Sequence, residues 1–187
     1  NEQNVFASTE RFLSLMAGQP ELRASPAACA RALSLASMGR LSTVNVSLVD
    51  AQGKTTCSST GKADIADYSE LSWWSAIKNR TKPFVSPQLI SEAAKKNVLP
   101  VTMPLHDAKG AFAGALVAAL DLRWVAQTNP YGRLPPVALM LIVDSKGDVI
   151  AANSAVPQGL GDAVAARKND SVQKTFEDTR GARWRWT

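Results

Sequence analysis

Residues 98–122 read VLPVTMPLHDAKGAFAGALVAALDL, two apolar runs joined by an Asp-Ala-Lys-Gly turn. Asp107 can hydrogen-bond its own backbone and Gly110 can take a positive φ angle, and this combination favours a β-hairpin turn. The second run has ten consecutive apolar residues, and a run of this length after a turn is typical of a buried strand. The stretch therefore predicts a long hairpin, 98–106 and 111–121, in an antiparallel sheet.

The same turn occurs twice more, in LVDAQGKTT at 48–56 and LIVDSKGDVIA at 141–151. Taken alone, each copy could be an unrelated surface turn. The first and third copies share more than a turn, because both run from an apolar strand through Val-Asp-x-x-Gly into a second strand and small polar residues. We interpret them as two related α+β units in tandem, with the hairpin at 98–121 inside the first unit.

The other local signals predict an antiparallel sheet with helices on one face. A first helix stops at Gly18 and Pro20, a second begins with Ser25 as N-cap and Pro26 in its first turn, and Ser69 is the expected N-cap of a short third helix. The expected segments are helices 1–23 and 25–39, strands 42–50 and 53–59, a helix at 69–79, a strand at 83–86 and an irregular loop at 87–97.

A second unit is expected after a linker. Proline, glycine and polar residues concentrate in 126–136, between two strong strand patterns, which indicates a boundary. Beyond it, 137–153 predicts a hairpin, 162–178 a short helix, and 180–187 the start of a strand without partners. The second unit is therefore expected to be incomplete.

The composition limits the classes of function. The chain of 187 residues has a net charge of +5, which would suit nucleic acid or an anionic surface, but its basic residues are scattered, so solvated faces explain them more simply. No stretch reaches the roughly 18 apolar residues of a membrane-spanning helix. The chain starts without Met in what reads as a helix, so we expect an excised piece, with signal or anchor sequences upstream.

Two cysteines, Cys29 and Cys57, form one possible pair. Free buried thiols are the alternative, but Cys29 falls on a predicted helix, Cys57 on a strand that this helix should cover, and neither has a histidine or second cysteine at metal-ligand spacing. We expect a disulfide, which would place this segment outside the cytosol.

Catalysis is difficult to build from these residues. His106 is the only histidine and sits at a hairpin turn, and the nucleophile, phosphate-loop and metalloprotease motifs are missing. Asp64 and Asp67 could be paired as catalytic carboxylates, as could Glu177 and Asp178, but acids of this kind are commonly helix starts or surface residues. We expect no enzyme activity, no metal and no cofactor in this segment.

Binding fits the sequence better. Trp73 and Trp74 lie side by side on the short helix, so one ring can enter the core while the other faces a pocket; two core rings are the alternative. The loop at 87–97 could form a pocket wall. Asp121, which follows ten apolar residues, needs a partner or a ligand, although capping of the next element would also account for it.

These features together resemble the double Cache domains, the PAS-like extracytoplasmic sensors of bacterial membrane receptors. The resemblance rests on VSLVDAQGKTTCSS, on SELSWWSAIKNRTKPFVS and most specifically on LPVTMPLHDAKGAFAGALVAALDL. It implies stalk and packing helices at 1–40, a membrane-distal module at 41–125, the linker at 126–136, and a partial membrane-proximal module at 137–187.

The resemblance also implies a function and a site. Such domains lie between two transmembrane helices, often dimerise through the first helix, and control a cytoplasmic diguanylate cyclase, histidine kinase or chemotaxis module. Trp73 and Asp121 match the Trp and Asp of the amino-acid-binding members, whereas Leu71 and Ala66 replace their Arg and Tyr. The implied ligand-binding residues are Tyr68, Trp73, Trp74, Ser86, Val101 and Asp121.

The sequence therefore predicts a periplasmic sensor domain that binds an unidentified small molecule. With Leu71 in the arginine position, an amine, polyol or neutral heterocycle is expected ahead of a plain amino acid. The alternative is a binder of nucleic acid or another anionic polymer that uses Lys95, Lys96, Arg183 and Arg185, although Arg183–Trp186 reads more simply as an edge strand.

Overall fold

The computed structural model describes residues 2–87 and 89–121, together with four short strands from the rest of the chain. The chain divides into two compact units, Asn1–Arg133 and Leu134–Thr187. In the first unit the elements are α1 (Glu2–Ala17), α2 (Glu21–Ala24), α3 (Pro26–Ser37), β1 (Thr43–Asp50), β2 (Thr55–Ser58), the 3-10 helix η1 (Tyr68–Glu70), α4 (Trp74–Ile77), β3 (Phe84–Val85), β4 (Leu89–Ser91), β5 (Lys96–His106) and β6 (Phe112–Asp121).

The first unit is built on one antiparallel sheet with the strand order β2-β1-β6-β5-β3, in which β4 also pairs with β5. The predicted hairpin is confirmed: β5 and β6 pair from Val98 opposite Asp121 to His106 opposite Phe112. Strand β6 is the middle strand of this sheet. Its residues 114–120 are all buried, on both faces of the sheet. At Gly114, φ is +125° and a Cβ atom would lie 2.1 Å from the Val49 carbonyl oxygen, so only glycine allows this approach of β1.

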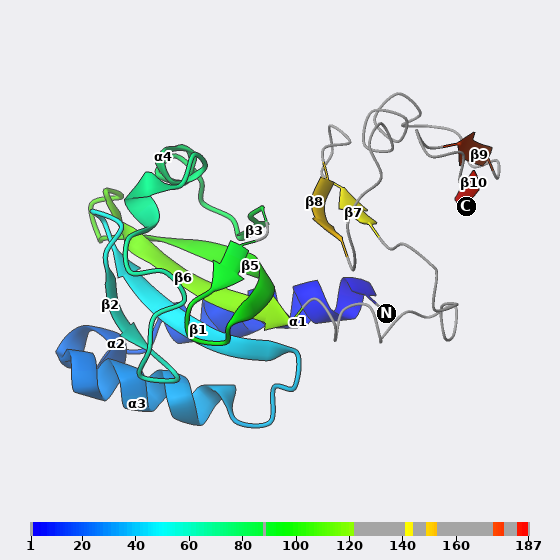
Figure 1. The fold of residues 1–187 in the computed structure, drawn as a ribbon. Helices are drawn as coiled ribbons and strands as arrows, with labels where there is room; N and C mark the ends of the chain where they lie inside the picture. The colour runs from blue at the N-terminus through cyan, green and yellow to red at the C-terminus, as the bar shows by residue number, and fades with distance from the viewer. Residues whose placement is uncertain are drawn as a thin grey trace. The chain divides into compact units, whose positions relative to one another are not determined.

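One face of the sheet is covered by the N-terminal helices (Figure 1). Helix α1 packs on β5 and β6, and α3 packs on β1 and β2. The predicted start of α3 is confirmed, because the Ser25 side chain accepts a hydrogen bond from Ala28 N and Pro26 occupies the first turn. A disulfide joins Cys29 of α3 to Cys57 of β2, with their Cα atoms 6.1 Å apart.

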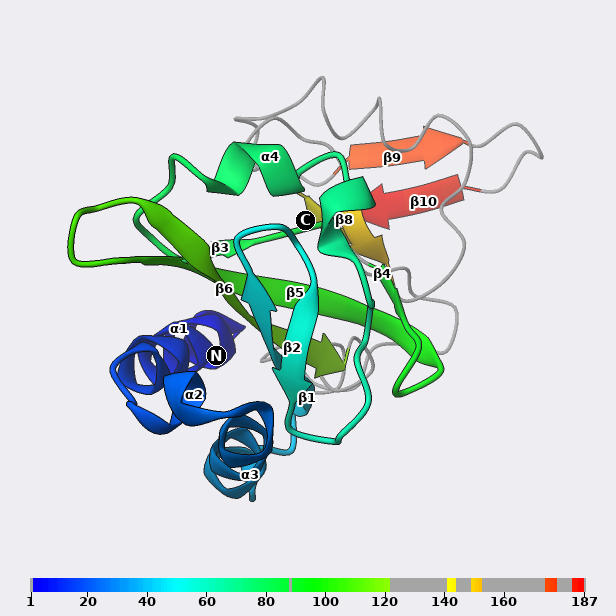
Figure 2. The same cartoon turned by 90° about the vertical axis from the view of Figure 1, so that its left-hand side faces the viewer.

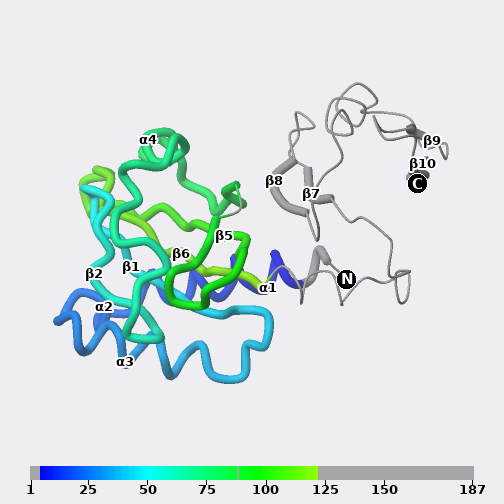
Figure 3. Tube along the Cα trace, viewed as in Figure 1, coloured from blue at the N-terminus to red at the C-terminus, as the bar shows by residue number. Residues whose placement is uncertain are grey.

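The other face of the sheet is covered by residues 59–83, which connect β2 to β3 and which we call the cover segment. Figure 2 shows α4 on the side of the sheet opposite α1 and α3, and Figure 3 follows the chain from β2 through α4 to β5. The prediction of helices on one face only is therefore wrong. Its physical reason is that Val49, Ala115 and Val117 are apolar on this face and bury Tyr68 of the cover segment.

Two local predictions in this region are also wrong. Ser69 is not an N-cap: Asp67 caps η1 instead, by accepting hydrogen bonds from the backbone N and the hydroxyl of Ser69. Leu71 is extended, so the expected helix divides into η1 and α4. The segment 87–97 is not an irregular loop, because β4 pairs with β5 from Leu89 opposite Val98 to Ser91 opposite Lys96.

The second unit contains two hairpins among its described residues. Strands β7 (Leu141–Val143) and β8 (Val149–Ala152) pair antiparallel, as expected within 137–153. Strand β10 (Arg183–Trp186) was expected to lack a partner and in fact pairs with β9 (Lys174–Glu177). Residues 174–177 are thus strand and not helix, because their backbone groups pair with β10. The linker at 126–136 lies outside the described residues.

Candidate functional site

The sheet face beneath the cover segment carries polar side chains among its buried residues. Because side chains alternate between the two faces of a strand, partners on neighbouring strands form rows. Two adjacent rows cross β1, β6 and β5 on this face: Asn45, Ala119 and Pro100, then Ser47, Val117 and Thr102. All of these residues are buried. Small and polar side chains thus form the floor of the candidate site.

An aromatic cluster of the cover segment lies next to this floor. Tyr68 is fully buried against Val49 and Val117. The Trp73 ring is 6.1 Å from the Tyr68 ring and 6.0 Å from the Phe84 ring, edge to face in both cases. Aromatic rings in this arrangement form a rigid apolar wall.

Asp64 is a buried residue of the cover segment, with 1% of its surface exposed. Its side chain accepts hydrogen bonds from Asn45 Nδ2 at 3.0 Å and from the Ser91 hydroxyl. Its backbone oxygen accepts from Glu92 N at 2.9 Å. Burial raises the pKa of Asp64, and the hydrogen bonds from Ser91 and Asn45 oppose that rise. Asp64 therefore ties the cover segment to β1 and β4.

Two buried hydroxyls on this face have no hydrogen-bond partner among the described residues, namely Ser47 Oγ and Tyr68 Oη. Burial, followed by the charge of Asp64, raises the pKa of Tyr68, so the phenol lies within electrostatic reach of that carboxylate. By contrast, the Ser86 and Thr102 hydroxyls bond each other at 3.0 Å. Buried hydroxyls are nearly always paired in folded proteins, so these two groups mark the place where a ligand atom would fit.

Comparison with known proteins identifies the family. A family model for the Cache domain, dCache_1, matches residues 1–187. The chain belongs to the Cache domain family. No curated protein sequence matches it.

Solved structures with the same fold are sensor domains. The extracellular domain of a protein described as the histidine kinase rpHK1S-Z16 has a TM-score of 0.71 at 17% identity, over 98% of this chain and 78% of that one. The ligand-binding domain of Pseudomonas aeruginosa PctB, in complex with L-Gln, has a TM-score of 0.69 at 16% identity, over 95% and 74%. That of Pseudomonas fluorescens chemoreceptor CtaA, in complex with L-serine, has a TM-score of 0.62 at 18% identity, over 79% and 64%. At these identities the likeness shows the fold alone.

The structure brings some of the predicted site residues of this Cache domain together. Tyr68, Trp73 and Trp74 form one aromatic cluster, and Ser86 is bonded to Thr102 on the same sheet face. Trp74 is 3% exposed and belongs to the core, whereas Trp73 is half-buried.

The two other predicted site residues lie on different faces of the sheet. Val101 pairs with Ala118, so strand alternation turns it to the face covered by α1, away from Thr102. Asp121 shares the site's face and pairs with Val98, two residues along the strands from the Ala119 row, about 7 Å, and four from the Thr102 row, about 13 Å. The Lys96 ammonium pairs with Asp121 at that end, so this carboxylate is already compensated.

Sequence reasoning missed the polar floor and Asp64. The spacing of Asn45 and Ser47, two residues apart in β1, is a signal that could have revealed polar groups on a buried face. Asp64 was interpreted as a helix-start or surface acid, and this is wrong, because the cover segment folds over it. No group of three or more His, Cys, Asp or Glu side chains that could hold a metal occurs among the described residues.

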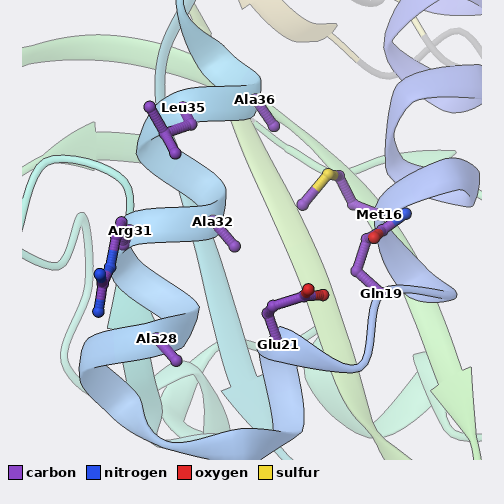
Figure 4. A pocket seen from close by; sticks show the side chains of 8 residues that line it. All are labelled: Met16, Gln19, Glu21, Ala28, Arg31, Ala32, Leu35 and Ala36. Carbon is purple, nitrogen blue, oxygen red and sulfur yellow. The ribbon is translucent and has the colours of Figure 1, made fainter.

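A separate groove of about 750 Å³ lies between α1 and α3, on the helical side of the sheet (Figure 4). Figure 4 shows Ala28, Ala32 and Ala36 of α3 facing Met16 of α1 across it. Leu35 at its edge is 64% exposed. The lining is mostly apolar, and its polar side chains are those of Gln19, Glu21 and Arg31.

None of the helices in the described part of the chain is long and apolar enough to cross a membrane.

Proposed function

We propose that this Cache domain is the extracytoplasmic sensor of a transmembrane receptor and that its small-molecule ligand binds between the cover segment and the β1-β6-β5 floor. The observation that carries the proposal is the pair of buried hydroxyls, Ser47 Oγ and Tyr68 Oη, without partners among the described residues. A buried hydroxyl left unpaired costs about 1–3 kcal/mol. A ligand that bonds both groups would remove that cost.

The same geometry supports signalling. Asp64, Tyr68 and Trp73 belong to the cover segment, whereas Asn45 and Ser47 belong to the sheet. A ligand that contacts both parts would favour the conformation in which they are closed together, and would shift a two-state equilibrium accordingly. Flanking transmembrane helices would carry this change to a cyclase, kinase or chemotaxis module.

Extracytoplasmic location is supported by the disulfide between Cys29 and Cys57, because disulfides persist in oxidising compartments.

We also propose that residues 41–125 form the distal module, that residues 137–187 form the partial proximal module, and that the protein is a homodimer through α1. Sedimentation velocity of the purified chain measures the last of these, and a monomer at all concentrations would remove it.

A thermal-shift screen of amino acids, amines, polyols and carboxylates tests the proposed function. A ligand at about 100 times its Kd stabilises the protein by roughly 2.7 kcal/mol. Tyr68→Phe and Ser47→Ala each remove one unpaired hydroxyl and should weaken the binding of a hit. Thr9→Val is the matched control, since Thr9 Oγ1 is also buried without a partner among the described residues but lies on α1. Equal binding by all three variants would place the ligand elsewhere.

A further inference from the structure

We propose that Arg40 couples the floor of the candidate site to α1, by fastening this helix to the turn from which β1 starts. The inference rests on the proposed function, to which it adds the residue that carries a change at the floor across to α1.

Arg40 contacts α1 in two ways, although 32 positions separate it from Ser8. Its Nη2 donates hydrogen bonds to the backbone oxygen and to the hydroxyl of Ser8, both at 3.2 Å. Its guanidinium carbon lies 4.2 Å from the centre of the Phe12 ring, a distance at which a cation is attracted to the face of a ring. One side chain thus holds α1 over a full helical turn.

The backbone of Arg40 belongs to the turn that leads into β1. Its N donates to Ser37 O at 3.1 Å, and its O accepts from Thr43 N at 3.0 Å. Thr43 is the first residue of β1, and Asn45 and Ser47 of the floor follow on the same strand. A shift of β1 at the floor is therefore carried to Arg40 by the strand itself and one turn.

Next to this contact, the groove of about 750 Å³ separates α1 from α3 (Figure 4). Met16 lines it from α1, and Ala32 and Ala36 line it from α3. Within the described residues, hydrogen bonds between α1 and the segment 25–43 come from Arg40 alone. Because the two helices are apart along the groove, Arg40 is the side chain that determines how α1 sits beside α3.

The contact is incompletely hydrogen-bonded in the described position of α1. Arg40 Nε and the Thr43 hydroxyl are buried there and lack partners within the described residues. Buried polar groups of this kind cost free energy, so a second position of α1 in which they gain partners would lie close in free energy to the first. Small shifts of packed helices between such discrete positions are a known basis of switching.

Hydrogen exchange of the full chain, measured by mass spectrometry without any ligand, tests the contact. Arg40→Met keeps an apolar stem over Phe12 and removes the charge and both hydrogen bonds. The amides of α1 should then exchange about tenfold faster or more. Arg31→Met replaces an arginine of α3 that lines the groove, and as the matched control it should leave α1 exchange at the native rate.

Coupling to the site is measured by combining Arg40→Met with Asp64→Asn, which alters the acceptor that Asn45 Nδ2 bonds at the floor. In the native background, Asp64→Asn should change the exchange rate of the α1 amides by about twofold or more. In the Arg40→Met background it should leave that rate unchanged, because the connection to α1 is missing. An Arg40 that only stabilises the fold would give the same Asp64→Asn effect in both backgrounds, and that result overturns the inference.

A milder pair of variants keeps the test decisive if Arg40→Met does not fold. Ser8→Ala removes one of the two acceptors of Arg40, whereas Ser14→Ala removes a hydroxyl that bonds Glu10 O within the same helix. Ser8→Ala should speed α1 exchange by about twofold or more relative to Ser14→Ala. Equal rates in these two variants would also overturn the inference.

The exchange experiments use no ligand, so their failure differs from a failure of the proposed function. A screening hit whose binding weakens in Tyr68→Phe would leave the proposed function standing even where Arg40→Met leaves α1 exchange unchanged and the Arg40 inference is wrong.

Discussion

Replacing Tyr68 by Phe removes one oxygen atom and leaves the aromatic ring that packs against Val49 and Val117. Tyr68 is 0% exposed and its hydroxyl has no partner among the described residues. An unpaired buried hydroxyl costs about 1–3 kcal/mol. We therefore expect the ligand-free variant to be more stable than the native protein by up to that amount. In a chain of this length each kcal/mol raises the Tm by about 2–4 °C.

The same substitution should weaken ligand binding, because one hydrogen bond to the ligand is lost, at about 0.5–1.5 kcal/mol or roughly two- to thirteenfold in Kd. Urea denaturation and thermal shift, with and without a screening hit, measure the two effects together. Thr9→Val should also stabilise the free protein, yet leave the ligand affinity unchanged. A Tyr68→Phe variant that is less stable than the native protein by 1 kcal/mol or more, on the order of one net hydrogen bond, would refute the reasoning, since the hydroxyl would then have a structural partner.

Three further predictions concern stability. Thiol titration of unreduced, denatured protein should find no free cysteine, and Cys29→Ser, which opens the bridge to Cys57, should cost about 3–4 kcal/mol in urea denaturation; two reactive thiols would contradict the bridge. Gly114→Ala should cost roughly 3 kcal/mol or more, because its Cβ would meet a β1 carbonyl oxygen at 2.1 Å, whereas Gly61→Ala, where nothing lies within 4 Å of a Cβ, should cost clearly less. The hydrogen bond from a lysine lowers the pKa of Asp67 from 3.8 to about 2, so its stabilising contribution is complete above pH 3.8 and is lost as pH falls toward 2; a difference in stability between native protein and Asp67→Asn that does not shrink over that range would count against the interaction.

Predictions that depended on neighbouring residues alone were the most successful. The turn at Asp107 and Gly110 forms as expected, with Asp107 Oδ1 accepting from Lys109 N and Ala111 N, and the start of α3 at Ser25 is confirmed. The expected N-cap at Ser69 fails for a reason of the same kind. Asp67, two residues earlier, competes for the same role and accepts from the Ser69 backbone N, because a carboxylate is the stronger acceptor.

The sequence by itself determined the turns at Asp50 and Asp107, the start of α3, the long central hairpin and the family, because each depends on short-range chemistry or on an ordered set of such signals. Only the tertiary structure decided which acid is buried and which one pairs with a lysine. Asp64 and Asp67 stand three positions apart, yet one is buried against Asn45 and the other pairs with Lys54 at the surface. Burial and charge pairing depend on contacts between residues far apart in the chain, and a local pattern does not encode which carboxylate the cover segment encloses.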